Sequence, residues 1–260
     1  MKVKNLGQVF TPKSIVEDIL NISDYYGENI LKKHVIDNSC GDGAFLTLIV
    51  DRYICEYYNK YNTYDGVEKE LEEYIHGIEV DYDIYILCLE NLRLKVSEYG
   101  LGFVEFDILN KNALDVKKYD NSMDFVLGNP PYVRVHNLSD QYSSVKKFSF
   151  CDSGMTDLYI VFYEIGLNML NDSGILCYIS PNSFYNSLAG NKLRQYIKKS
   201  QSMEVLMDLG HYQPFDVMTY TTICKICNNS KFNMCRYFKY PLQRLFPYKR
   251  HRHFLIFCLF

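Results

Sequence analysis

The sequence has no tryptophan, no internal repeat and no apolar run long enough to cross a membrane. Its first residues, Met1 to Asn5, are polar, and no apolar signal-peptide core follows them. These absences exclude repeat and membrane-spanning architectures and predict a cytoplasmic protein with no membrane partner. Of the 260 residues, 48% are hydrophobic and 23% are charged, which is typical of a globular protein with a substantial core.

A disulfide pattern is also missing, although the chain contains nine cysteines. The number is odd, the cysteines are scattered, and most lie in apolar runs, so we expect reduced thiols in the core. Cys224 and Cys227 form a lone CxxC in a strand-like stretch. A zinc site needs a second pair of ligands, which Cys235 alone does not supply, so we predict no metal.

Residues 231–260 contain no acidic residue but seven Lys and Arg. The first 230 residues therefore hold 21 basic and 31 acidic residues, a net charge of −10 within a whole-chain charge of −3. We predict one domain over residues 1–230 and treat 231–260 as an atypical basic and apolar tail, truncated or altered in its reading frame. A nucleic-acid-binding function would require a basic surface that is local or that another domain supplies.

Short apolar runs alternate with longer amphipathic ones along the first 180 residues. Strands are predicted at 35–37, 73–80, 102–107, 123–127 and 174–179, and helices at 44–58, 82–97 and 157–170. This alternation predicts an α/β fold with a mostly parallel sheet and helices on both faces. Further runs at 205–210 and 220–227 predict an antiparallel hairpin that closes the sheet. The polar segment 59–73 is predicted to be a surface extension.

A glycine-rich turn, Asp37 to Phe45, follows the first predicted strand and opens the first long helix. Gly41 and Gly43 allow a tight turn and a close approach of the backbone to a ligand. A pyrophosphate site would have Gly or Ala three residues after Gly43, and this chain has Leu46. The turn therefore favours a ligand without pyrophosphate, while a glycine turn with no ligand stays open.

Acidic residues follow the next two predicted strands. Glu79 and Asp81 stand at the end of the second, where a carboxylate can accept hydrogen bonds from ribose hydroxyls, and we favour Glu79. Asp107 is predicted to end the third strand and could accept a hydrogen bond from an adenine amine, although a helix-capping role is as good an interpretation.

The fourth predicted strand ends in Asn129-Pro130-Pro131-Tyr132. The prolines fix the backbone and leave carbonyl acceptors in a rigid loop at the carboxyl edge of the sheet. Asn129 adds a side-chain acceptor, and Tyr132 adds a flat ring. Two acceptors beside a stacking surface suit a planar substrate that carries an NH₂ group.

In this order, the motifs from residue 7 to about residue 228 resemble those of the N6-adenine DNA methyltransferases of restriction–modification systems. By that resemblance, residues 7–12 pack against the methionine end of the cofactor, which assigns Thr11 and Pro12 to cofactor binding. The cofactor loop supplies Asp37, Ser39, Gly41 and Gly43. Glu79 matches the ribose-binding acid, and Asp107 matches the acid that binds the adenine of the cofactor.

The second half of the resemblance concerns the reaction. Asn129, Pro130, Pro131 and Tyr132 match the catalytic tetrapeptide, and residues 156–159 and 174–181 are similar to the helix and strand motifs that follow it. Residues 213–217 and 219–223 resemble a loop whose aromatic residue packs on the target base. This makes Phe215 the second stacking residue beside Tyr132.

The resemblance implies a Rossmann-like S-adenosylmethionine-dependent methyltransferase fold, S-adenosylmethionine as cofactor and double-stranded DNA as substrate. Residues 1–230 would then be a catalytic domain that methylates the N6 amine of a flipped-out adenine, as the modification part of a restriction–modification system. We expect no target-recognition domain in these 260 residues and therefore a separate specificity or restriction subunit as partner.

Three alternatives stay open on the sequence alone. The first is an RNA or protein-glutamine methyltransferase, because Asn-Pro-Pro-Tyr serves an amide as well as a ring amine. The second is a truncated, inactive remnant that binds the cofactor or a partner subunit. A dehydrogenase is the third, and Leu46 disfavours it.

Overall fold

The computed structural model describes residues 11–135, 145–151, 156–212, 219–240 and 253–254. Its strands form a sheet in the order β3-β2-β1-β4-β5-β7-β6-β8-β9. Their bounds are β1 Val35–Asp37, β2 Ile75–Glu79, β3 Asp107–Asn110, β4 Met123–Gly128, β5 Leu170–Pro181, β6 Met203–Asp208, β7 Thr221–Cys227, β8 Cys235–Lys239 and β9 His253–Phe254. The first five pair in parallel, and β7 pairs antiparallel with both β5 and β6.

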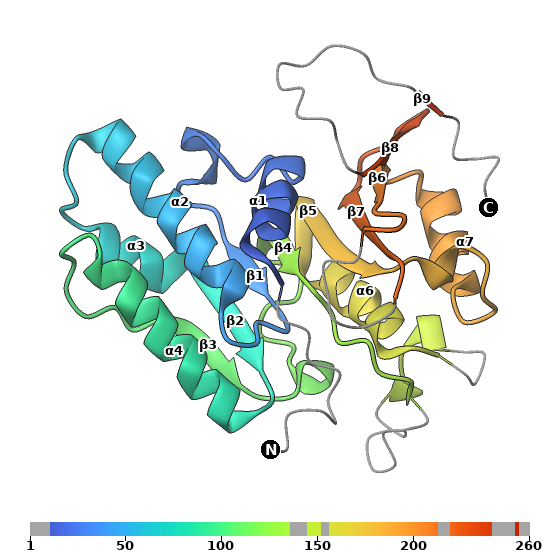
Figure 1. Cartoon of the computed structure of the whole chain (residues 1–260), viewed down its shortest axis with the longest axis horizontal. Helices are drawn as coiled ribbons and strands as arrows, with labels where there is room; N and C mark the ends of the chain where they lie inside the picture. Colours follow the sequence, from blue (N-terminus) through green and yellow to red (C-terminus); the bar gives the residue numbers. More distant parts are fainter. Residues whose placement is uncertain (1–10, 136–144, 152–155, 213–218, 241–252, 255–260) are drawn as a thin grey trace.

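Helices cover both faces of this sheet. The long helices are α1 Lys13–Ile22, α2 Ala44–Tyr61, α3 Val67–Tyr74, α4 Tyr82–Ser97, α6 Leu158–Met169 and α7 Asn191–Ser200. In Figure 1, α2, α3 and α4 lie together on one side of the molecule, and α6 and α7 lie on the other. Adjacent strand residues alternate between these layers, since Val35 belongs to the core cluster under α1 to α4 and Ile36 to the one under α6 and α7. The predicted α/β architecture with a C-terminal antiparallel hairpin is confirmed.

Several local predictions agree closely with the structure. Helix α4 spans the predicted residues 82–97 because Asp81 caps it, accepting hydrogen bonds from the backbone N–H groups of Asp83 (3.0 Å) and Ile84 (3.2 Å). Eight cysteines lie in the described residues, all as free thiols and all buried except Cys55. Cys224 and Cys227 are three positions apart on β7, so their side chains leave opposite faces of the sheet.

One prediction is wrong and a second is incomplete. The third strand was expected at 102–107, but β3 begins at Asp107, because β2 offers partners only from His76, which pairs with Asp107, to Glu79. The segment 59–73 was expected to be a surface extension, but α2 continues to Tyr61 and α3 begins at Val67, and α3 buries Val67 and Leu71 completely. Its apolar residues are too few to predict a packed helix from composition.

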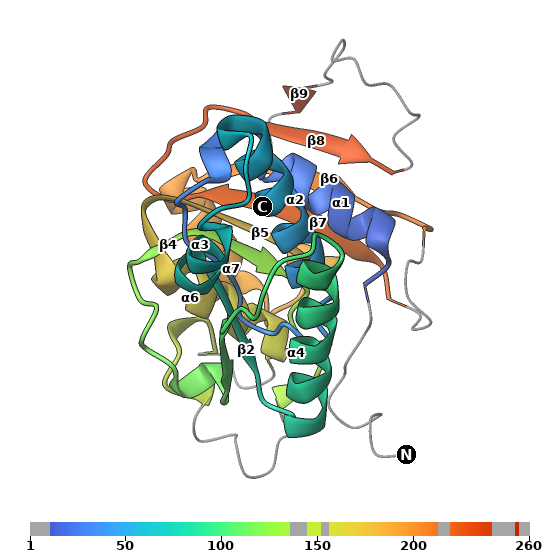
Figure 2. The same cartoon turned by 90° about the vertical axis from the view of Figure 1, so that its left-hand side faces the viewer.

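The segment predicted to be an atypical tail begins inside the fold. β8 pairs in parallel with β6, and the side chain of Cys235 is buried in the core. Figure 2 shows β8 at the upper edge of the molecule, far from α4. In the described part of the chain, no helix combines the length and apolar character that a membrane crossing requires.

Candidate active site

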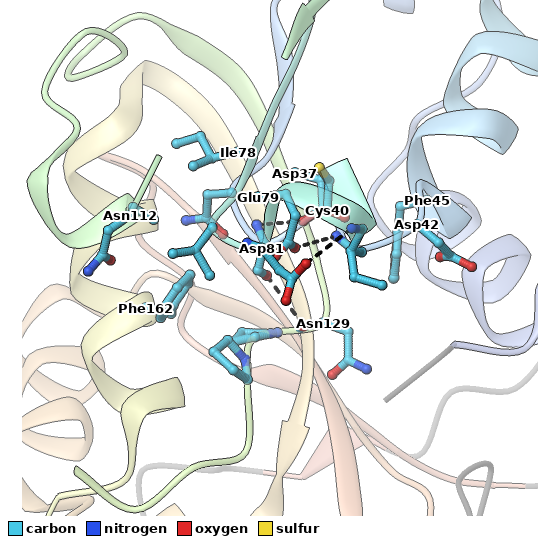
Figure 3. A pocket seen from close by; sticks show the side chains of 18 of the residues that line it. Asp37, Cys40, Asp42, Phe45, Ile78, Glu79, Asp81, Asn112, Asn129 and Phe162 are labelled. Atoms are coloured by element: carbon cyan, nitrogen blue, oxygen red, sulfur yellow. Dashed lines mark hydrogen bonds between the residues drawn. The ribbon is translucent and has the colours of Figure 1, made fainter. Parts of the chain in front are cut away.

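A cavity of about 430 Å³ opens at the carboxyl edge of the sheet (Figure 3). Its lining includes residues 37–42 after β1, 78–82 at the end of β2, 111–114 after β3 and 129–131 after β4. The strand order reverses between β1 and β4, and ligands in open α/β sheets bind at such a point. The fold therefore brings the motifs that were predicted separately into one space.

The two glycines of the turn after β1 have different tasks. Gly41 adopts φ +54° beside open space and lines the cavity. Gly43 adopts φ +88° at the start of α2, where an added Cβ would lie 3.0 Å from the Cys88 sulfur of α4. Gly43 was predicted to bind cofactor, but in the structure it lies behind the cavity lining and makes room for helix packing.

Glu79 connects this turn to the end of β2. One carboxylate oxygen accepts a hydrogen bond from the Gly41 N–H at 3.0 Å, and the other accepts one from the Asp81 N–H at 2.9 Å. The side chain is only 6% exposed, and burial raises its pKa. Each carboxylate oxygen has a second lone pair, so Glu79 can still accept hydrogen bonds from a ligand in the cavity.

Asp37 is the most deeply buried acid of the site, at 1% exposure. Burial raises its pKa to about 7, although its Oδ1 atom accepts a hydrogen bond from the Ser39 N–H at 3.0 Å, which opposes that rise. β4 comes so near that a Cβ on Gly128 would lie 2.5 Å from the same oxygen. A glycine at position 128 is therefore required for Asp37 to occupy this place.

Asn129 faces the same cavity as the glycine turn. The Ser39 hydroxyl donates to the Asn129 main-chain carbonyl at 3.3 Å, and the Asn129 side-chain amide donates to the Thr11 hydroxyl at 3.1 Å. Asn129, Pro130 and Pro131 all line the cavity with Gly41. The glycine turn and residues 129–131 therefore share one cavity, which a direct transfer between them requires.

Tyr132 is half-buried and packs against the core instead of lining the cavity. Its ring packs against both core clusters, its hydroxyl donates to the Ile179 carbonyl at 3.5 Å, and it is not among the cavity-lining residues. Burial raises the pKa of its hydroxyl, so the ring stays neutral. Pro12 immediately precedes α1 and does not line the cavity either. Phe215, the second predicted stacking residue, lies outside the described residues.

Asp107 is placed at the opposite edge of the sheet. It begins β3, and its carboxylate binds His76 at 2.8 Å and Lys118 at 2.7 Å. This position does not support the predicted contact with the adenine of a cofactor. Asn112 instead follows β3 and lines the cavity, with its side-chain oxygen accepting from the Leu114 N–H at 3.1 Å. Asn112 was not predicted because the third strand was expected to end at residue 107, three residues before β3 ends at Asn110.

Apolar side chains complete the cavity around Asn112. Val80 and Tyr82 line the cavity and are exposed, and Leu114 and Phe162 line it as well. Such surfaces suit a flat ring, which an amide such as Asn112 can contact at its polar edge. None of these residues belonged to the predicted site.

The cavity is rich in acids. Its lining contains Asp37, Asp42, Glu79 and Asp81, with Lys111 as the cation among the lining residues. This composition would repel a pyrophosphate and attract a ligand with positive charge. S-adenosylmethionine carries a sulfonium and an ammonium group besides its ribose and adenine, so the residues present fit that cofactor better than a dinucleotide.

A family model of known proteins matches residues 82–215, just over half of the chain, and is described as the Eco57I restriction-modification methylase. Among curated relatives, the type II methyltransferase M.BstVI of Geobacillus stearothermophilus is 28% identical over 223 residues, which cover 81% of this chain and 39% of that protein. The chain thus spans about two fifths of the length of this relative.

Solved structures share the fold. A protein of Listeria monocytogenes assigned as a class I S-adenosylmethionine-dependent methyltransferase superposes with a TM-score of 0.67 at 18% identity, covering 88% of this chain and 65% of that one. A nuclease-deletion mutant of the restriction-modification enzyme LlaGI, solved with a DNA substrate mimic, gives 0.69 at 16% identity and covers 90% and 24%. The fold is that of class I methyltransferases.

Proposed function

This chain belongs to the Eco57I restriction-modification methylase family, and on that premise we propose that it transfers a methyl group from S-adenosylmethionine to the N6 amine of adenine in DNA. The observation that carries the proposal is the shared cavity of Asn129 and Gly41, joined by the bond from Ser39 to the Asn129 carbonyl. An acceptor pair and a cofactor turn in one space are what a direct transfer requires.

Glu79 would hold the ribose of the cofactor, and Asn112 would contact its adenine between the apolar side chains of Val80 and Phe162. Asp37, Ser39, Gly41 and Thr11 lie on the side where the amino-acid part would bind. When bound, the cofactor supplies an electrophilic methyl group. The acidic lining would favour the charged cofactor over a neutral product, which assists product release after the reaction.

Asn129 and Pro130 would hold the amine of the target base through their carbonyl oxygens. Accepting both amine hydrogens directs the nitrogen lone pair along one line, and most of the rate comes from this positioning. An asparagine cannot take up a proton, so the proton lost from the nitrogen would leave to water. Asp37 and Glu79 are already engaged by backbone N–H groups and are not needed as bases.

The amine of a paired adenine lies inside the duplex, so the base has to be flipped out toward Asn129 at a cost of a few kcal/mol. Stacking on an aromatic ring is worth about 1–3 kcal/mol and would offset much of that cost. We assign Tyr132 and Phe215 to this stacking. The two core clusters that hold the Tyr132 ring would fix its orientation, which lowers the entropy lost on stacking.

We further propose double-stranded DNA as substrate, a separate specificity or restriction subunit as partner, and the cytoplasm as location. The body of the chain carries a net charge of −10, so it has little general attraction for DNA. A partner that supplies a basic surface would resolve this mismatch.

Methyl transfer from radiolabelled S-adenosylmethionine to unmethylated duplex DNA tests the function, with N6-methyladenine identified by mass spectrometry. Asn129→Ala should abolish transfer while cofactor affinity, measured by calorimetry, persists. Asn168→Ala, an exposed asparagine on α6, is the matched control and should be fully active. Calorimetry on the chain alone also tests the cofactor assignment without any DNA.

Full turnover by the Asn129→Ala protein would refute the catalytic role. If the label is transferred to RNA or to protein glutamine but not to DNA, the substrate is that molecule and not DNA. A chain that binds the cofactor but methylates nothing, even with its specificity subunit, would be a remnant.

A further inference from the structure

Asn129 is contacted by two hydroxyl groups that come from different parts of the chain. The Thr11 hydroxyl accepts a hydrogen bond from the Asn129 side-chain amide at 3.1 Å, and the Ser39 hydroxyl donates one to its main-chain carbonyl at 3.3 Å. One bond acts on the carboxamide and the other on the backbone. The family resemblance assigns Thr11 and Ser39 to the cofactor and gives neither of them this contact.

Both hydroxyls stand on rigid supports. Thr11 is 8% exposed and is followed directly by Pro12, the residue before α1. The Pro12 carbonyl accepts hydrogen bonds from the backbone N–H groups of Ile15 and Val16, whose side chains are completely buried. Ser39 is fixed through its N–H by Asp37, which β4 in turn holds in place through the close approach of Gly128. A hydroxyl that cannot move far can hold its partner in one orientation.

The orientation of Asn129 matters because the two ends of a carboxamide are chemically opposite. The oxygen accepts hydrogen bonds and the nitrogen donates them, so a rotation by half a turn would present a donor to the target amine. With its nitrogen bonded to Thr11, the side chain directs its oxygen away from Thr11. The bond from Ser39 sets the position of the backbone from which the side chain starts.

We propose that Thr11 and Ser39 are positioning residues that clamp Asn129 in the orientation needed to accept the target amine. This inference rests on the proposed function, since it explains how the acceptor is prepared before the base enters. The two hydrogen bonds also connect the cofactor side of the cavity to the substrate side.

The test compares purified Thr11→Val, which keeps the shape and loses the hydroxyl, with Thr11→Ser, which keeps the hydroxyl. Thr47→Val is the matched control, because among the described residues the Thr47 hydroxyl bonds only to the Gly43 and Ala44 carbonyls of its own helical turn. Initial rates on duplex DNA at saturating cofactor give kcat, calorimetry gives cofactor affinity, and NMR records the Asn129 side-chain NH₂ signals, identified by their loss in Asn129→Ala.

We expect Thr11→Val to lower kcat about tenfold with a smaller change in KM for DNA, since one hydrogen bond is worth about one such factor. Thr11→Ser should restore kcat, and Thr47→Val should leave it unchanged. The Asn129 NH₂ signals should shift in Thr11→Val and stay in place in Thr47→Val. Ser39→Ala provides a second, independent test, with a loss of about threefold expected from its longer bond.

The clamp is overturned if Thr11→Val keeps the wild-type kcat and unshifted NH₂ signals, or if Thr11→Ser is as impaired as Thr11→Val. Loss of cofactor affinity with unchanged kcat at saturation would also overturn it, because Thr11 would then serve the cofactor alone. If the wild-type chain methylates no DNA even with its specificity subunit, the proposed function fails, while the NMR signals still decide whether the clamp exists.

Discussion

The two ends of the same parallel strands hold acidic side chains in opposite ways. At the carboxyl edge, Asp37 and Glu79 are held by backbone N–H groups beside the cavity. At the amino edge, Asp107 is bonded to Lys118 and to His76, whose other ring nitrogen lies 2.9 Å from His34. We call these four residues the amino-edge network. Among the described residues, Asp37 and Glu79 form no ion pair at the carboxyl edge, whereas Asp107 at the amino edge is paired with Lys118.

The pKa values follow this difference. Burial raises the pKa of Asp37 to about 7 and also raises that of Glu79. Burial would raise the pKa of Asp107 too, but hydrogen bonds from Lys118 and His76 outweigh it and hold the pKa below its usual value. A paired acid stabilises the fold, while an acid buried without a cation costs stability that a cationic ligand can return. The comparison therefore separates a binding edge from a structural edge.

The largest expected effect comes from exchanging one acid at each edge for its amide. Glu79→Gln should weaken S-adenosylmethionine binding about 100-fold, because charge-assisted bonds to the ribose are lost. Asp107→Asn should leave that affinity unchanged and lower the free energy of unfolding at pH 7 by about 1–2 kcal/mol. Calorimetric titration and urea denaturation of both proteins measure the two quantities. An equal loss of cofactor affinity in both variants would contradict the distinction between a binding edge and a structural edge.

Gly128→Ala probes the crowding at the carboxyl edge. The added Cβ would lie 2.5 Å from the Asp37 carboxylate, so the strand or the acid must shift, at an expected cost of about 2–3 kcal/mol in unfolding free energy and with loss of cofactor binding. Gly102→Ala is the control, because its nearest atom would be 3.9 Å away. A Gly128→Ala protein with wild-type stability would show that Asp37 is not tightly enclosed.

Asp37→Asn should change stability with the opposite sign to Asp107→Asn at alkaline pH. The folded pKa of about 7 lies above the unfolded pKa of Asp37. The stability that protonated Asp37 contributes is therefore fully present below the unfolded pKa and is lost as the pH rises through 7. The variant should therefore gain about 2 kcal/mol relative to wild type between pH 5.5 and pH 8. Urea denaturation at both pH values measures this gain, and a pH-independent difference would contradict it.

The smallest effect is expected from Lys118→Met in the amino-edge network. Lys118 is half exposed, so its ion pair with Asp107 should contribute less than about 1 kcal/mol to unfolding free energy and less still at high salt. Methyl transfer should be unaffected. Denaturation at two salt concentrations measures the contribution, and a large loss of activity would place the network in the catalytic machinery.

The carboxyl edge was easier to predict than the amino edge. Gly41, Glu79 and Asn129 each follow an apolar run, and parallel strands that end at one edge bring such residues together whatever the loops do. His34, His76 and Lys118 carry no local signal, and no spacing in the sequence predicts that they meet.

The error at Asp107 has the same origin. Val104 and Phe106 are buried and alternate with polar residues, which is the pattern of a strand. They pack on the core without a partner strand, because β2 is only five residues long and pairs further along the chain. Because β3 begins and ends later in the sequence than predicted, Asn112 lies at the cavity and Asp107 does not.

By itself the sequence determined the order of the elements, the two-sided sheet and the motifs that follow its strands, because hydrophobic period and turn chemistry are local properties. The tertiary structure decided which acid faces the cavity, which glycine serves packing, and which hydroxyls contact Asn129. Those outcomes depend on strand register and on side chains up to 118 positions apart, such as Thr11 and Asn129. Contacts between residues so far apart in the sequence form only when the strands pair in register and the helices pack on the sheet.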